Sequence, residues 1–226
     1  MCLPRALKAV VFDMDGLIFD TEALYQQAYV EAAKLGGFEV APEAIQLAIG
    51  MPWVRGRGLM LEVLGEQFPI DDYYTQMTDR FVALSATDLR LKPGVIELLD
   101  VLDRLQLPRC IATSSAHSTV RDHLSAHNLT DRFHAVIGHG DYERSKPAPD
   151  TFLLAAERLG VEASCCLALE DSHHGVRSAS AAGMMTIMVP DLMPPTDEIA
   201  GLCHAVVDSL HDVGVLVLGA AGAPTQ

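Results

Sequence analysis

The pattern of apolar positions begins with a continuous run from Ala9 to Phe12, which ends at two aspartates, Asp13 and Asp15. A valine-rich run of this kind, bounded by Gly16, is typical of a parallel strand that is buried on both faces of a sheet. Asp13 is therefore expected at the carboxyl edge of a sheet, where ligands bind in open α/β folds. Taken alone, Asp-x-Asp-Gly is more often a simple turn, because Asp and Gly favour turns.

After this first strand the pattern changes to a helical one, and no further buried-strand run appears between Thr21 and Asp88. A block of helices placed directly after a first strand predicts a small inserted bundle of four helices. These helices are expected over residues 23–35, 42–49, 54–65 and 71–85.

From Leu89 onwards, apolar runs with strand character alternate with helical segments. Strands are expected over residues 109–113, 135–138, 165–169, 184–189 and 205–207, and helices over residues 93–105, 117–127, 150–159 and 174–182. Such alternation predicts a parallel sheet with helices on both faces. The expected fold is α/β, with a Rossmann-like core from residues 1–20 and 89–226 and an inserted four-helix unit, residues 21–88.

Polar residues stand where several of these strands end or where the next helix begins. Thr113 and Ser114 follow the second strand, and Lys146 precedes a helix in Ser-Lys-Pro-Ala-Pro-Asp. A hydroxyl beside the free N–H groups of a helix start can bind an anion, and a lysine can add a positive charge. Simpler interpretations remain open, since Ser114 or Ser115 could cap the helix and Lys146 could be a solvated surface residue.

Glu170 and Asp171 end another buried strand, where two carboxylates are costly without a partner. A cation shared with Asp13 would supply one, and a hard divalent ion such as Mg²⁺ suits a site made of oxygen atoms. The adjacent His173 and His174 could suggest zinc, but no Cys or His lies at a suitable spacing from them. Both are therefore interpreted as residues that begin a helix.

Composition narrows the function classes. Half of the 226 residues are apolar, and 16 Lys and Arg against 30 Asp and Glu give a net charge of −14. This charge argues against nucleic acid and anionic membranes as partners. An odd number of cysteines without Cys-x-x-Cys pairs indicates reduced thiols of an intracellular protein, and no signal peptide or membrane span is found. A cytoplasmic monomer is expected.

Together, these strand ends are far more specific than any one of them. In the order Asp13-Met-Asp15, Thr113, Lys146 and Glu170-Asp171, the sequence resembles the haloacid dehalogenase superfamily over nearly its whole length. The helical insertion is similar to the C1-type cap of that family. The segments Asp-Gly-Leu-Ile-Phe-Asp-Thr-Glu, Lys-Pro-Ala-Pro-Asp and Glu-Asp-Ser-x-x-Gly resemble the subgroup that contains β-phosphoglucomutase and many small phosphatases.

The resemblance implies a role for each matched residue. Asp13 would be the nucleophile that forms an aspartyl-phosphate, and Asp15 would be the general acid and base. Thr113, the N–H group of Ser114 and Lys146 would bind the phosphate oxygens, and Lys146 would also be a catalytic residue.

The same resemblance implies a Mg²⁺ ion. Asp13, the backbone carbonyl of Asp15 and Asp171 would hold this ion, and Glu170 would act through its outer shell.

Substrate selection would fall to the helical insertion. The candidate loop contains Gly50, Trp53 and Arg55, with Arg57 nearby, although arginines at a helix start are usually solvated. The sequence departs from the mutase pattern at Tyr25, where β-phosphoglucomutase has a histidine that pairs with the acid/base aspartate. The absence of this histidine favours hydrolysis over mutase activity.

The expected function is therefore a phosphoric monoester hydrolase. It would use Mg²⁺ and an aspartyl-phosphate to act on a small phosphorylated metabolite, either a sugar phosphate or a nucleoside monophosphate. A phosphosugar mutase is the alternative, and a binding protein without catalysis is a third hypothesis.

Overall fold

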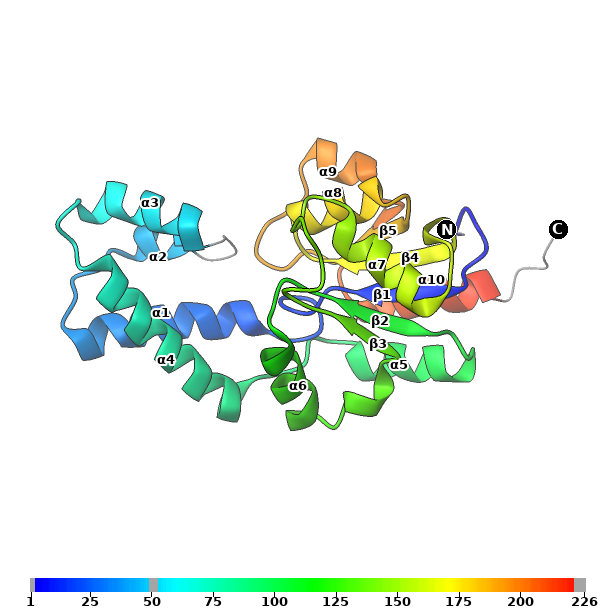
Figure 1. The fold of residues 1–226 in the computed structure, drawn as a ribbon, viewed down its shortest axis with the longest axis horizontal. Coiled ribbons are helices and arrows are strands. Elements are labelled where there is room, and N and C mark those ends of the chain that lie inside the picture. The colour runs from blue at the N-terminus through cyan, green and yellow to red at the C-terminus, as the bar shows by residue number, and fades with distance from the viewer. Residues whose placement is uncertain (1–2, 49–52, 222–226) are drawn as a thin grey trace. The chain divides into compact units, whose positions relative to one another are not determined.

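The computed structural model describes residues 3–48 and 53–221. The chain divides into two compact units, and Figure 1 shows the elements of each. An α/β unit comprises residues 1–19 and 91–226, and a helical unit comprises residues 20–90. The boundaries between the two units that we predicted from the sequence lie at 20/21 and 88/89.

The α/β unit is built on one parallel sheet, as predicted. Among the described residues, six strands lie in the order β3-β2-β1-β4-β5-β6. They are β1 (Ala9–Phe12), β2 (Arg109–Ala112), β3 (Ala135–Ile137), β4 (Cys166–Glu170), β5 (Met185–Met188) and β6 (Ala205–Val206). Val11 of β1 pairs with Cys110 of β2 on one side and with Ala168 of β4 on the other. The first strand of the sequence is thus a central strand of the sheet.

Alternate residues of β1 face the two sides of the sheet, and both sets are buried. Ala9 and Val11 belong to a core cluster that includes Phe152, whereas Val10 and Phe12 point to the opposite face and are at most 1% exposed. A strand covered on both faces needs apolar residues at every position. This explains why β1 is a continuous apolar run in the sequence.

Helices connect the strands of the α/β unit. They are α5 (Val95–Arg104), α6 (His117–Ala126), α7 (Asp150–Leu159), α8 (His173–Ala181), α9 (Asp197–Leu202) and α10 (Leu210–Ala221), with short 3-10 turns at η1 (Thr130–Arg132) and η2 (Ala163–Cys165). The sequence did not predict α9 or α10. Valine and glycine are poor helix formers, so α10 depends on packing against α5, which buries Val213 and Val217. None of the helices in the described ranges has the length and apolar character that a membrane crossing requires.

The helical unit contains α1 (Thr21–Gly36), α2 (Pro42–Ala48), α3 (Trp53–Leu64) and α4 (Ile70–Asp88). Its main internal contact joins α1 to α4. Tyr73 of α4 is fully buried, packs against Phe38 and Phe68, and donates a hydrogen bond from its hydroxyl to the backbone oxygen of Tyr29, 2.8 Å away. One residue thus contributes both apolar packing and a buried polar contact between the two long helices.

This contact can be tested by two substitutions of different severity. Tyr73→Phe removes only the hydrogen bond and should lower the free energy of unfolding by about 1 kcal/mol. Tyr73→Ala also removes the ring and should lower it by about 3–5 kcal/mol, because a cavity remains. Urea denaturation followed by circular dichroism measures both values. Equal stability of wild type and Tyr73→Phe would mean that the hydrogen bond contributes nothing.

Candidate active site

Three neighbouring strands bring polar side chains to one edge of the sheet. Asp13 directly follows β1, Thr113 directly follows β2, and Glu170 is the last residue of β4. The backbone N–H of Asp13 donates to Leu169 O at 3.0 Å, and that of Thr113 donates to Ile137 O at 2.9 Å. The sheet ladder therefore continues past the strand ends and fixes the backbone beneath the site.

Lys146 connects two of these strand ends. Its ammonium group donates to Asp13 Oδ1, to Glu170 Oε1 at 2.6 Å and to the backbone oxygen of Ala112 at 2.9 Å. Its side chain is only 8% exposed, and the Phe152 ring centroid lies 4.9 Å from Nζ. The open alternative of a solvated surface lysine is wrong, because a turn before α7 directs this side chain inward.

The electrostatics of the cluster follow from burial and close charges. Burial raises the pKa of Asp13 to about 7, and the carboxylates of Glu170 and Asp15 add to this rise while Lys146 opposes it. Burial alone would favour the neutral amine of Lys146, but the charges of Asp13 and Glu170 outweigh it and raise the pKa of Lys146. The ammonium therefore stays charged, and Asp13 depends on positive charge nearby to be ionised.

Glu170 is held as a fixed partner of Lys146. Its second oxygen, Oε2, accepts from the backbone N–H groups of Asp171 (3.2 Å) and Ser172 (3.3 Å) and from the Ser172 hydroxyl (3.0 Å). A Cβ at Gly175, in the first turn of α8, would lie 1.8 Å from Glu170 Cδ, so only glycine fits there. With both oxygens already accepting hydrogen bonds, Glu170 is suited to positioning other groups.

Asp15 lies among hydroxyl groups. Its Oδ2 accepts from the Ser115 hydroxyl at 2.6 Å and from the Thr113 hydroxyl at 3.4 Å, while Thr113 Oγ1 accepts from the Ser115 N–H at 3.0 Å. Ser114 is exposed, and the N-cap of α6 is Ala116, so neither serine is the cap residue of that helix. From the sequence, Ser115 was interpreted only as a possible cap of the helix. The position of Ser115 close after a strand was the signal that could have predicted a role in the site.

Three carboxylates form a group that fits a divalent cation. Asp13, Glu170 and Asp171 can each place one oxygen so that all three lie within 4.8 Å of one another. Gly16 has φ +80°, and a Cβ there would lie 2.4 Å from Asp171 Oδ2, so only glycine lets this carboxylate pack so close to the turn. Three hard oxygen donors this close together fit Mg²⁺.

Two further charged residues lie at this edge and were not predicted. Asp191, in the loop after β5, forms an ion pair of 2.6 Å with Lys92. A Cβ at Gly16 would lie 3.2 Å from Asp191 Oδ2, so this carboxylate approaches Gly16 on the same side as Asp171. The signal was again a polar residue after a strand.

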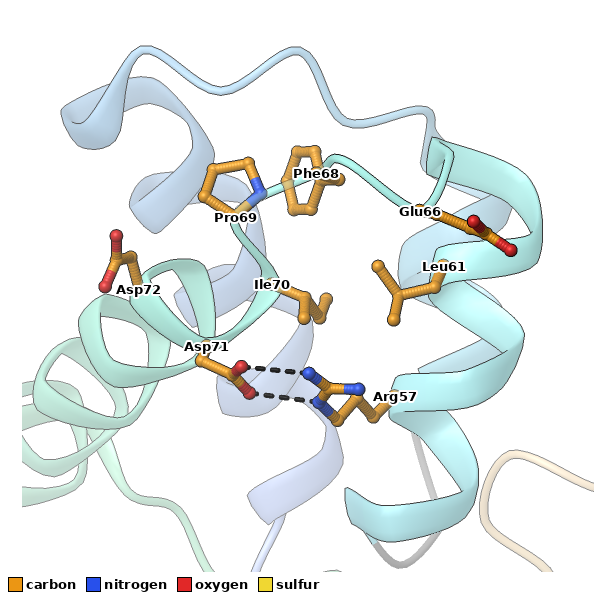
Figure 2. Close-up of a pocket in the computed structure, with 8 residues that line it drawn as sticks. All are labelled: Arg57, Leu61, Glu66, Phe68, Pro69, Ile70, Asp71 and Asp72. Carbon is orange, nitrogen blue, oxygen red and sulfur yellow. Dashed lines mark hydrogen bonds and ion pairs between the residues drawn. The ribbon is translucent and has the colours of Figure 1, made fainter.

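The helical unit contains the candidate substrate-binding residues Gly50, Trp53 and Arg55. Gly50 lies outside the described residues, and the side chains of Trp53 and Arg55, at the start of α3, also lie outside what the structure describes. Arg57, suggested as a substrate contact, donates to both oxygens of Asp71, at 3.0 and 2.9 Å (Figure 2). Its guanidinium is thus already occupied by a carboxylate of its own unit.

This ion pair borders an open pocket of 340 Å³. Figure 2 shows the lining residues Arg57, Leu61, Glu66, Phe68, Pro69, Ile70, Asp71 and Asp72. Its carboxylates outnumber its arginine, which makes it a poor receptor for a phosphate group.

Residues 10–189 match the family model for haloacid dehalogenase-like hydrolases. This range includes every site residue of the α/β unit described above except Asp191. The chain belongs to the haloacid dehalogenase-like hydrolase family. The predicted family is therefore confirmed.

Several relatives of this haloacid dehalogenase-like hydrolase are named as phosphatases. A probable pseudouridine-5'-phosphatase of Drosophila melanogaster is 37% identical over 193 residues, which is 83% of each chain. Fructose-1-phosphate phosphatase YqaB of Escherichia coli is 32% identical over 80% of this chain and 95% of its own. The predicted enzyme class, a phosphoric monoester hydrolase, is confirmed.

A solved structure shares the fold of this hydrolase. The crystal structure of a candidate β-phosphoglucomutase from Thermotoga maritima has a TM-score of 0.81 and 26% identity, and the match covers 94% of this chain and 99% of that one. The α/β fold of this hydrolase is thus shared over nearly its full length.

The close packing of Glu170 on Gly175 generates a testable prediction. Gly175→Ala should lower the free energy of unfolding by about 1–3 kcal/mol, because the added methyl group overlaps a carboxylate that is held by several hydrogen bonds. Gly201→Ala is the matched control, since that glycine is also helical but has no atom within 4 Å of the added Cβ. Thermal and urea unfolding compare the two. The packing account fails if both variants are equally stable.

Proposed function

We propose that this hydrolase removes the phosphate group from a small metabolite, a sugar phosphate or a nucleoside monophosphate, through an aspartyl-phosphate on Asp13. The observation that supports it most is the buried contact of Lys146 with both Asp13 and Glu170. It places a permanent cation next to the candidate nucleophile. The names of the two relatives, a pseudouridine-5'-phosphatase and a fructose-1-phosphate phosphatase, support the two substrate classes.

In the first step a carboxylate oxygen of Asp13 attacks phosphorus. A bond forms between this oxygen and phosphorus while the bond from phosphorus to the ester oxygen breaks. Asp15 donates a proton to the leaving oxygen, so that an alcohol departs instead of an alkoxide. The Ser115 hydroxyl, which donates to Asp15 Oδ2 at 2.6 Å, holds the acid in place and leaves the Thr113 hydroxyl free to turn towards the phosphate.

In the second step water attacks the phosphorus of the aspartyl-phosphate. Asp15, now a carboxylate, takes a proton from this water, and the bond between Asp13 and phosphorus breaks. Inorganic phosphate leaves, and both aspartates return to their starting states. Splitting one displacement in two lets a weak carboxylate nucleophile act on an ester.

Stabilisation of the phosphate oxygens falls to Lys146, the Thr113 hydroxyl and the Ser114 N–H. The three donors of Lys146 already have acceptors, so a phosphate oxygen would replace one of them.

The residues proposed to hold Mg²⁺ are Asp13, the backbone carbonyl of Asp15, and Asp171, with Glu170 in the outer shell. When bound, the ion would neutralise charge on the phosphate and on the nucleophile.

Hydrolysis is favoured over the mutase alternative by Tyr25. Its ring is stacked on Phe81 with centroids 3.9 Å apart and planes 8° apart, within the helical unit. A panel of phosphate esters with Mg²⁺ separates the hypotheses. Release of free phosphate supports the proposal, formation of an isomer without release supports a mutase, and binding with neither supports a binding protein.

The nucleophile is tested by Asp13→Asn. This variant should fold but lose turnover by several orders of magnitude, because an amide cannot attack phosphorus in this way. Initial rates of phosphate release measure the loss, and circular dichroism checks the fold. Substantial activity in this variant would remove Asp13 from its proposed role.

The metal is tested by removal and replacement. EDTA should abolish activity and added Mg²⁺ should restore it, because the carboxylates of Asp13 and Asp171 need a small hard cation. Ca²⁺ should inhibit, since its larger and looser coordination shell misplaces the nucleophile. Phosphate release is again the measurement. Full activity in excess chelator would contradict the Mg²⁺ assignment.

A further inference from the structure

The loop after β5 places one more carboxylate beside the proposed metal ligands. The position that a Cβ of Gly16 would occupy is 2.4 Å from Asp171 Oδ2 and 3.2 Å from Asp191 Oδ2. The two oxygens therefore approach the same side of Gly16 and lie close to each other. The loop is anchored at its start, because Val189 N donates to Glu170 O at 2.8 Å, and further on by a contact of 3.0 Å between Pro194 O and a histidine of α8.

The two oxygens of Asp191 have different surroundings. Oδ1 accepts from Lys92 Nζ at 2.6 Å, and the Lys92 and Asp191 side chains are 21% and 12% exposed. Oδ2 is buried and has no hydrogen-bond partner among the residues that the structure describes. A buried carboxylate oxygen without a donor is costly, so a donor from outside the chain is expected to reach it.

Lys92 fixes Asp191 relative to the first strand. Its backbone N–H donates to Ile18 O at 2.9 Å, in the turn that follows Asp15. Its side chain spans from that turn to the loop after β5. Lys92 thus links the turn that follows Asp15 to the loop after β5. Because it binds Oδ1 of Asp191, Oδ2 is the oxygen left on the side of Gly16.

We propose that Asp191 is a positioning residue for the Mg²⁺ ion, an inference that rests on the proposed function. Mg²⁺ keeps several of its water molecules when it binds to proteins, and these waters are strong hydrogen-bond donors. Asp191 Oδ2 accepts a hydrogen bond from one of these waters, while Lys92 holds Oδ1. Asp191 thereby orients the hydrated ion without contacting the substrate.

An ordinary ion pair is the alternative for Lys92 and Asp191. A pair with this sole purpose contributes to stability, and its removal leaves metal affinity unchanged. A positioning residue has the opposite signature, because loss of an outer-shell contact typically lowers metal affinity by about 10- to 100-fold. Metal affinity measured without substrate therefore separates the two.

The test uses the full chain and Mn²⁺ as the probe. Free Mn²⁺ is measured by electron paramagnetic resonance, and competition with Mg²⁺ gives the Mg²⁺ affinity. Asp191→Asn should weaken both affinities by about 10- to 100-fold. Lys92 would retain the amide oxygen, so the amide nitrogen would take the place of Oδ2 and present a donor to a donor. Asp191→Ala removes both oxygens and should weaken binding similarly.

Two control variants make the result specific. Glu198→Gln removes the same charge from the Arg177–Glu198 ion pair and should bind Mn²⁺ like wild type. Asp171→Asn, at a proposed ligand, should bind far more weakly than any other variant. If folded Asp191→Asn or Asp191→Ala binds like wild type while Asp171→Asn is impaired, the inference on Asp191 is overturned alone. If wild type does not bind, or Asp171→Asn binds like wild type, the proposed metal site itself fails.

Discussion

The site depends on one buried interaction, the contact of the Lys146 ammonium with the carboxylates of Asp13 and Glu170. Removing three charged groups from water is expensive, and their attraction offsets this only where the geometry is well satisfied. The structure meets this condition, because Ala112 O takes the third donor of Lys146 and the Ser172 hydroxyl contacts Glu170. Removing Lys146 would leave two buried carboxylates side by side without a cation.

The sheet makes this interaction possible. Asp13 and Glu170 come from β1 and β4, which are adjacent and paired in parallel, so their carboxyl ends share one edge. Continuous apolar runs bury both strands and leave the polar residues at their ends. The free energy gained by burying these strands thus offsets the repulsion between the carboxylates of Asp13 and Glu170. A loop without a buried core could not hold the two groups together.

The overall charge of −14 makes a phosphate monoester an unfavourable partner for most of the surface. At the sheet edge Lys146 and Lys92 each contact carboxylates, but the carboxylates there outnumber these two lysines. The proposed Mg²⁺ ion would supply the positive charge that an anion needs at this edge. Selectivity for an anion would then arise from a small region inside a strongly acidic molecule.

Much of this arrangement could be predicted from the sequence because its signals are local. The apolar run of β1 predicts that Asp13 follows a buried strand, and the turn residues before α7 predict that Lys146 precedes a helix. Contacts between distant residues left no such signal. The pairing of Lys92 with Asp191, the burial of Lys146 and the bond from Ser115 to Asp15 join residues that only the fold brings together. The helix α10 was missed because packing against α5, and not its own propensity, stabilises it.

The central claim is that Asp13 forms an aspartyl-phosphate, and Asp15→Asn offers the most direct test. Acetyl phosphate transfers its phosphate group with acetate as the leaving group, which needs no proton, so the first step should proceed in this variant. The second step needs Asp15 as a base and should be slow. Mass spectrometry of the acid-quenched protein should therefore find a phosphate group that accumulates on Asp13. Phosphate on a different residue, or no covalent phosphate in a folded variant that consumes acetyl phosphate, would contradict the account.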